Sequence, residues 1–196
     1  MNLANKITIS RIFLAFGFMY LLFLKGFMPK VFSLVVFIIA SWTDFLDGFL
    51  AKKRNEVSDF GKLMDPIADK ILVIAAFLAF VEMKLVPAWI VVIIVFREFM
   101  ITGLRLIALT RGEIIEAEMA GKHKTVSQMI SIYVILLFII CKESGRNVFG
   151  FWNQEFESLL KEIIFYMMVI TALLTLISGI SYLAKNKRFF INAKNK

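Results

Sequence analysis

Four aspartates lie close together in a chain that is otherwise strongly apolar. Asp44 and Asp47 are three positions apart, and Asp65 and Asp69 are four positions apart. Because successive residues of an α-helix turn by about 100°, each pair would lie on one helix face. Carboxylates beside hydrocarbon are costly unless a cation neutralises them, so acids in such segments indicate a functional site. The four aspartates therefore predict a site that binds cations.

The ligand type limits which cation this site can hold. Carboxylate oxygens are hard ligands, which favour Mg²⁺, Mn²⁺ or Ca²⁺. The chain has one cysteine and one histidine, which argues against a Cys/His zinc site and against an intramolecular disulfide framework. Two facing carboxylate pairs can hold two metal ions about 3.5–4 Å apart, which stabilises the attacking and leaving oxygens of a displacement at phosphorus. We therefore expect two ions, Mg²⁺ or Mn²⁺, and phosphoryl transfer.

Small residues accompany both aspartate pairs. Gly48 and Ala51 follow Asp47, and Gly61 precedes the second pair. Their size would let a bulky ligand approach the backbone closely. The alternative is that the aspartates cap helices and pair with nearby cations, which are Lys52, Lys53, Arg54 and Lys62. That alternative explains neither the spacing of both pairs nor the small residues beside them.

A second group of residues is basic and lies in the fourth apolar segment and the loop after it: Arg97, Arg105, Arg111, Lys122 and Lys124. An anionic acceptor would need such cations, because carboxylates alone would repel it. Arg105 lies inside an apolar run, and Lys124 with Thr125 is predicted to open a helix whose N-terminus attracts phosphate. Arg105, Lys124, Thr125 and Arg111 are thus the candidate phosphate ligands. We expect Glu98 to pair with a neighbouring cation.

These residues must be positioned by apolar helices. Of the 196 residues, 60% are hydrophobic, which is too many for an ordinary soluble domain. A membrane-spanning helix needs about 20 residues. We predict an all-α integral membrane protein with one domain, residues 1–196, and a short interfacial helix at 4–11. Six transmembrane helices are expected at 12–24, 31–50, 63–81, 86–107, 126–141 and 162–184.

The charge distribution predicts the orientation. In the six-helix arrangement, 17 of the 23 Lys and Arg residues lie on the side that carries the N-terminus, the aspartates and the tail. By the positive-inside rule that side is cytoplasmic, which places the site at the cytoplasmic face of the cell membrane. The net charge of +8 is explained by this bias and by anionic lipid head groups, so no nucleic-acid partner is expected. The N-terminal segment lacks a small-residue cleavage site and is expected to be retained.

The aspartate segment resembles the signature of the CDP-alcohol phosphotransferase family, D-x2-D-G-x2-A-R-x8-G-x3-D-x3-D. It matches at every position but one, as Asp44-x2-Asp47-Gly48-x2-Ala51-Lys52-x8-Gly61-x3-Asp65-x3-Asp69. The resemblance implies that the four aspartates bind the metal ions, that Asp69 is also the general base, and that CDP and its diphosphate bind beside Gly48, Ala51, Lys52 and Gly61. Lys52 replaces the arginine of the signature and lacks its bidentate fork. Direct contact of residue 52 with the nucleotide is therefore left open, and Lys53 or Arg54 could substitute.

Three further segments, NKITISRI, REFMITGLRLIALTRG and GKHKTVSQM, are similar to members of this family that use sn-glycerol 3-phosphate. The resemblance implies a six-helix transmembrane homodimer that converts CDP-diacylglycerol and sn-glycerol 3-phosphate into phosphatidylglycerol phosphate and CMP. The same chemistry with serine, inositol phosphate or phosphatidylglycerol as acceptor is the nearest alternative. A cation transporter is a remote alternative, because its acids would be spread through the membrane depth. A non-catalytic scaffold would leave the signature unexplained.

Overall fold

The computed structural model describes residues 3–51, 59–110, 119–145 and 153–186, with side chains for 9–43, 70–108, 121–144 and 153–186. Its regular secondary structure is entirely helical in these ranges, which confirms the all-α prediction. Six helices follow one another: α1 (Leu3–Phe23), α2 (Phe27–Ala51), α3 (Asp59–Glu82), α4 (Ala88–Thr110), α5 (Met119–Gly145) and α6 (Gln154–Lys185).

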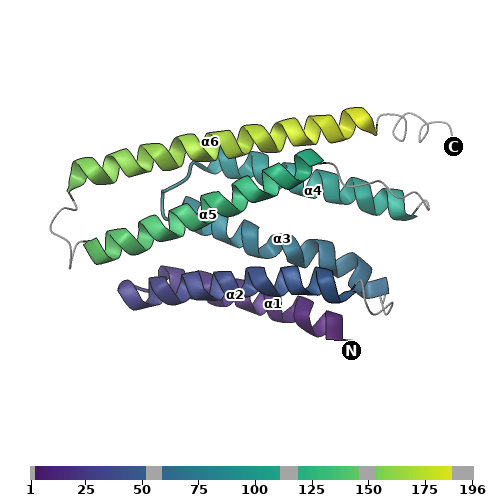
Figure 1. Cartoon of the computed structure of the whole chain (residues 1–196), viewed down its shortest axis with the longest axis horizontal. Coiled ribbons are helices and arrows are strands. Elements are labelled where there is room, and N and C mark those ends of the chain that lie inside the picture. The colour runs from purple at the N-terminus through teal and green to yellow at the C-terminus, as the bar shows by residue number, and fades with distance from the viewer. Residues whose placement is uncertain (1–2, 52–58, 111–118, 146–152, 187–196) are drawn as a thin grey trace.

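The helices lie side by side in an elongated bundle (Figure 1). Helix α1 packs against α2 and α3, and α2 also packs against α5. Helices α3, α4, α6 and α5 form a closed ring, in which each packs against the next and α5 packs back against α3. Every member of this ring can therefore direct side chains toward a shared interior.

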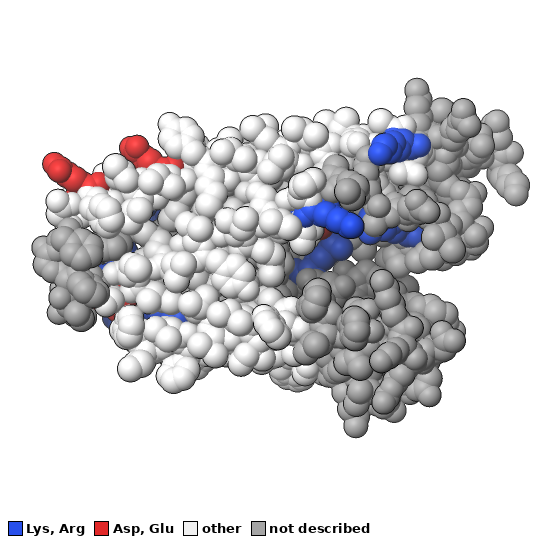
Figure 2. Space-filling model, viewed as in Figure 1, with Lys and Arg blue, Asp and Glu red and all other residues white. Residues whose placement is uncertain are grey.

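One end of the bundle gathers several helix ends, and we call it the terminal end. Helix α1 begins there and α6 ends there; α2 and α4 also end there, and α3 and α5 begin there (Figure 1). Figure 2 shows the largest groups of Lys and Arg side chains toward this end, at the rim of a hollow in the surface, whereas the acidic side chains of the visible face lie toward the other end. The charge asymmetry expected from the sequence is thus an asymmetry along the bundle.

Aromatic side chains fill the interior where α1, α2, α3 and α5 meet. Phe18, Phe37, Phe77 and Phe80 are fully buried. The Phe37 ring lies 5.4 Å from the Phe18 ring and 5.5 Å from the Tyr133 ring, measured between centroids. Aromatic contacts at this distance add about 0.5–1.5 kcal/mol each beyond the burial of apolar area. They join helices from both halves of the chain.

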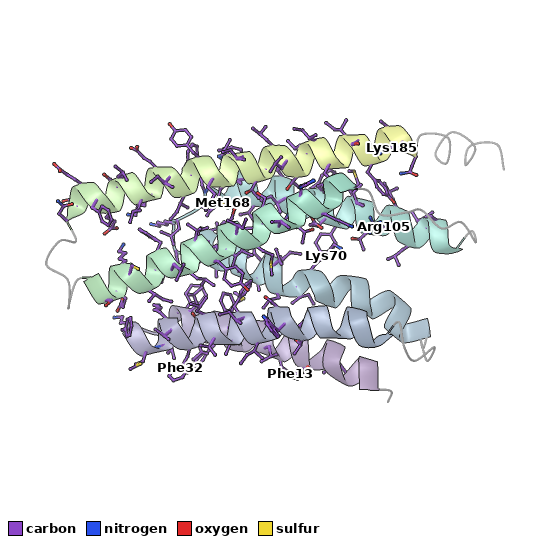
Figure 3. All side chains as sticks on the ribbon, viewed as in Figure 1. Phe13, Phe32, Lys70, Arg105, Met168 and Lys185 are labelled. Carbon is purple, nitrogen blue, oxygen red and sulfur yellow. The ribbon has the colours of Figure 1, made fainter. Side chains whose placement is uncertain are left out.

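The outer surface of the bundle is apolar. Phe13 and Phe32, which are 72% and 57% exposed, project from its lower edge, whereas Met168 points inward (Figure 3). Within the described residues, two helical segments are long and apolar enough to cross a membrane, Gly121–Ser144 and Gln154–Lys185. A surface this rich in large apolar side chains is expected of a membrane protein and not of a soluble one.

Several helix bounds differ from the predicted ones. The separate interfacial helix expected at 4–11 is wrong, because residues 4–11 and the following apolar run form the single helix α1. No glycine or proline interrupts that junction, so the backbone hydrogen bonds continue through it. Helix α5 begins seven residues before the predicted 126–141 segment, and α6 begins eight residues before 162–184. Polar residues extend both helices beyond the apolar stretches by which they were recognised.

The turn between α1 and α2 is held by one lysine. Lys30 is buried, and its ammonium donates hydrogen bonds to the carbonyl oxygens of Leu22 and, at 2.7 Å, of Leu24. The Leu22 carbonyl is one of the last four of α1, which lack a partner within the helix, and Leu24 directly follows the helix end. Gly26 supplies the positive φ of +103° that the turn requires, and its N–H donates to Glu143 of α5 at 3.0 Å. The turn is thereby tied to both helices and to α5.

Candidate active site

The aspartates of the signature lie on two neighbouring helices. Asp44 and Asp47 are in the last two turns of α2, and Asp65 and Asp69 are in the first half of α3, which packs against α2. Since both segments are helical, residues three and four apart are neighbours on one helix surface, as predicted. Their side chains are outside the described set, and among the described side chains no group of three or more His, Cys, Asp or Glu could hold a metal ion.

The small residues of the signature fall on the same two helices. Gly48 and Ala51 belong to the end of α2, and Gly61 to the first turn of α3, whereas Lys52 and Arg111 lie outside the described residues. Pro66 is the eighth residue of α3, so it does not occupy a first turn, where a proline is best tolerated. Without an N–H of its own, Pro66 cannot donate to the carbonyl of residue 62. The carbonyl of residue 62 therefore lacks its usual donor within the helix.

A buried polar cluster occupies the interior of the four-helix ring near the aspartates. Glu98 of α4 lies at its centre and is 7% exposed. Its carboxylate contacts the Lys124 ammonium of α5 and lies 3.6 Å from the Arg97 guanidinium and 4.0 Å from the Lys70 ammonium of α3. Gln128 of α5 donates to it at 3.4 Å. We call these residues, with Ser178, the Glu98 cluster: Lys70, Arg97, Glu98, Lys124, Gln128 and Ser178.

The Glu98 cluster draws on every helix of the ring. Arg97 donates to the Ser178 hydroxyl of α6 at 2.7 Å, so α6 is joined to α4. Lys70 directly follows Asp69, the predicted general base, so the cluster also reaches the aspartate helix. A buried charge is tolerated only when paired and hydrogen-bonded, which is the arrangement around Glu98. The prediction that Glu98 pairs with neighbouring cations is therefore confirmed.

The two predicted phosphate ligands at the start of α5 have different surroundings. Lys124 is 4% exposed and its ammonium is engaged by Glu98, whereas Thr125 is exposed and donates to the Gly121 carbonyl at 3.0 Å. Adjacent residues of a helix point about 100° apart, which accounts for the difference. The expectation that they open the helix is wrong, because α5 begins at Met119. The free N–H groups of its first turn belong to earlier residues.

Arg105 has a different kind of neighbour. It is exposed on α4, and its guanidinium carbon lies 5.5 Å from the centroid of the Tyr182 ring of α6. A cation at this distance over an aromatic face is attracted by the negative face of the ring. Figure 3 shows Arg105 and Lys70 in the half of the bundle nearer the terminal end.

Four residues of this region were not among the predicted site residues. They are Lys70, Gln128, Ser178 and Tyr182. Gln128 carried a signal that could have found it, because an amide in an apolar span must find a polar partner. Serine and tyrosine are common in helices of membrane proteins, so Ser178 and Tyr182 carry no comparable signal. Only the packing of α6 on α4 identifies their partners.

Known proteins resemble this chain over most of its length. A family model described as CDP-alcohol phosphatidyltransferase matches residues 1–177. A CDP-diacylglycerol–glycerol-3-phosphate 3-phosphatidyltransferase of Bacillus subtilis (strain 168) is 37% identical over 198 residues, covering 94% of this chain and 95% of the relative. A protein of the same name from Rickettsia bellii (strain RML369-C) is 33% identical over 190 residues, covering 96% and 97%. The chain therefore belongs to the CDP-alcohol phosphatidyltransferase family.

Proposed function

We propose that this enzyme transfers the phosphatidyl group of CDP-diacylglycerol to sn-glycerol 3-phosphate, giving phosphatidylglycerol phosphate and CMP in phospholipid biosynthesis. The observation that carries the proposal is the similarity of nearly the whole chain to relatives whose printed name states this transfer. The aspartate signature on α2 and α3 supports the same chemistry.

The donor set fits a divalent metal cofactor. Asp44, Asp47, Asp65 and Asp69 supply only carboxylate oxygens, which suit Mg²⁺ or Mn²⁺, and they lie on two helices that pack together. These four residues would hold the ions, most simply two of them. Bound there, the metal would supply Lewis-acid stabilisation of charge on the diphosphate.

Other roles proposed for the signature residues are binding of the CDP moiety and acceptance of the acceptor's proton. Gly48, Ala51 and Gly61 leave room beside the backbone for the CDP moiety, with Lys52 as a cation for its diphosphate. Asp69 accepts the proton of the glycerol 1-hydroxyl, whose oxygen attacks the phosphorus that carries the lipid. The bond from that phosphorus to the CMP oxygen breaks, and CMP leaves. The proton on Asp69 is released afterwards to water.

The phosphate of the acceptor needs cations that face the same end of the bundle. Arg105 is the best placed of the described candidates, because its guanidinium is exposed and no described carboxylate forms an ion pair with it. Thr125 and Arg111 remain candidates from the sequence. The Lys124 ammonium is already engaged by Glu98 inside the four-helix ring, so it would contribute positive electrostatic potential to the site and not a direct contact with the phosphate.

We further propose that all six helices cross the cytoplasmic membrane, with the terminal end and the active site at the cytoplasmic face. The excess of Lys and Arg toward this end supports that orientation. The acyl chains of CDP-diacylglycerol would enter sideways from the bilayer, and a homodimer is the assembly that the family resemblance implies.

One experiment tests the reaction and separates it from its alternatives. Purified protein in detergent is given CDP-diacylglycerol, Mg²⁺ and one acceptor at a time: sn-glycerol 3-phosphate, inositol phosphate, serine or phosphatidylglycerol. CMP release with sn-glycerol 3-phosphate, accompanied by a lipid product that carries a terminal phosphate monoester, is expected. Release only with another acceptor would overturn the acceptor assignment, and no release with any acceptor would overturn the reaction.

A further inference from the structure

One face of α6 near its C-terminal end is in contact with both arginines of α4. Ser178 and Tyr182 are four positions apart and therefore lie on one surface of the helix, beside Gly179. All three are buried, and all three follow residue 177, where the match to the family model ends. These residues are thus not part of the signature by which the family is recognised.

The first of these contacts fixes Arg97. The Ser178 hydroxyl accepts a hydrogen bond of 2.7 Å from its guanidinium, and Gly179 lies beside its aliphatic stem. A Cβ atom on Gly179 would lie 3.1 Å from Cγ of Arg97, which is closer than side chains normally approach. An alanine at this position would therefore push the Arg97 stem aside by a few tenths of an ångström.

The second contact orients Arg105. The Tyr182 ring lies beneath the guanidinium at 5.5 Å and is only 2% exposed, so it is held firmly by the surrounding helices. A carboxylate partner would occupy some of the five N–H donors of an arginine, whereas an aromatic face holds the cation and leaves those donors available. Among the described side chains, no carboxylate forms an ion pair with Arg105, and the Tyr182 hydroxyl has no hydrogen-bond partner.

We propose that Ser178, Gly179 and Tyr182 form a platform on α6 that positions Arg97 and Arg105 for the phosphate of the acceptor. The inference rests on the proposed function and specifies which residues outside the signature select a phosphorylated acceptor. Ser178, Gly179 and Tyr182 are positioning residues, since they act through the arginines. Arg105, whose guanidinium lies over the Tyr182 ring, is the group that binds the phosphate bidentately.

The test compares kinetic constants for the two substrates in variants of the full-length protein. Tyr182→Leu removes the ring, and we expect KM for sn-glycerol 3-phosphate to rise about tenfold while KM for CDP-diacylglycerol stays within about twofold. Tyr182→Phe keeps the ring and should restore most of that loss. Tyr166→Leu is the matched control, because Tyr166 is an aromatic residue of the same helix that is 65% exposed on the outer surface.

A coupling experiment distinguishes positioning from general disturbance of the fold. If Tyr182 acts through Arg105, then Tyr182→Leu should add little to the rise in acceptor KM already caused by Arg105→Ala. If Tyr182→Leu does not yield folded protein, Gly179→Ala tests the same platform at Arg97 and should raise the acceptor KM several-fold. Independent, multiplicative effects of Tyr182→Leu and Arg105→Ala would overturn the proposal, as would an unchanged acceptor KM in folded Tyr182→Leu or Gly179→Ala.

The proposed role of α6 and the proposed reaction can be refuted separately. Failure of the wild-type protein to release CMP with sn-glycerol 3-phosphate would refute the reaction itself. Normal wild-type turnover combined with unaltered platform variants would refute only the role of α6.

Discussion

The carboxylate of Glu98 on α4 contacts the ammonium of Lys124 on α5 inside the four-helix ring, with Arg97 and Lys70 on its other sides. Both side chains of the pair are less than a tenth exposed. Such a pair costs free energy when it is desolvated, and it becomes strongly destabilising when one member is removed and the other charge stays buried. The stability of the bundle should therefore depend on both residues together.

Removal of one member of this pair should destabilise the fold. We expect Glu98→Ala to lower the free energy of unfolding by about 3–5 kcal/mol, and the double variant Glu98→Leu, Lys124→Met to recover most of that loss. Thermal unfolding in detergent measures both. Glu162→Gln, at an exposed position of α6, is the control and should have little effect. Equal unfolding temperatures for wild type and Glu98→Ala would show that the pair contributes nothing.

Asp69 is predicted to remove the proton of the acceptor hydroxyl. Asp69→Asn keeps the shape of the side chain but cannot accept this proton, so kcat should fall by about 10²–10⁴. CDP-diacylglycerol binding, measured by calorimetry in detergent, shows whether the variant still folds and binds its donor substrate. A folded Asp69→Asn protein that binds CDP-diacylglycerol and turns over at the normal rate would exclude the role.

Metal removal should abolish catalysis. Because four carboxylates form the proposed site, a chelator such as EDTA should stop CMP release, and added Mg²⁺ or Mn²⁺ should restore it. Circular dichroism of the chelated protein should keep its helical signal, since the bundle is also held by its aromatic core. Activity that persists in excess chelator would argue against a metal-dependent reaction.

Lys30 should stabilise the turn between α1 and α2. Lys30→Met retains the aliphatic stem but loses the hydrogen bonds to the Leu22 and Leu24 carbonyls. We expect a loss of about 1–3 kcal/mol, because a buried acceptor is left without its donor. Lys25→Met alters an exposed lysine of the same turn and serves as the comparison in thermal unfolding. If the two variants unfold at the same temperature, the turn does not depend on Lys30.

The proposed orientation can be tested with single cysteines at the two ends of α6. In a Cys141→Ser background, Asn153→Cys should react with a membrane-impermeant maleimide added to intact cells. Ala184→Cys, at the terminal end, should react only after the cells are permeabilised. The reverse pattern would place the active site on the outer face.

The sequence was sufficient to predict six helices, because each contains a long apolar run. It was less informative about helix ends, since hydropathy marks only the apolar middle of a helix. The backbone hydrogen bonds of α5 and α6 continue through polar residues such as Lys122 and Glu157. Similarly, the interfacial helix expected at 4–11 includes Arg11, which is buried within the continuous helix α1.

For the site, the sequence identified residues whose chemistry is unusual for their surroundings. Aspartates near a membrane and Arg105 in an apolar run are such residues, and Glu98 was expected to be paired. The partners were harder to predict, because Arg97 and Ser178 are 81 positions apart and meet only through the packing of α4 on α6. No local pattern distinguishes Tyr182 from the other tyrosines of the chain.

The closed ring of α3, α4, α6 and α5 also bears on how the protein is made. Proteins are synthesised from the N-terminus, so α4 emerges with Arg97 and Glu98 before α5 brings Lys124 and before α6 brings Ser178. Arg97 and Glu98 are adjacent in the sequence, and their charged groups lie 3.6 Å apart in the folded bundle, so this pair does not depend on residues of α5 or α6. The contacts that Ser178 makes with Arg97 therefore form only after α6, the last of the six helices, has been synthesised and has packed against α4.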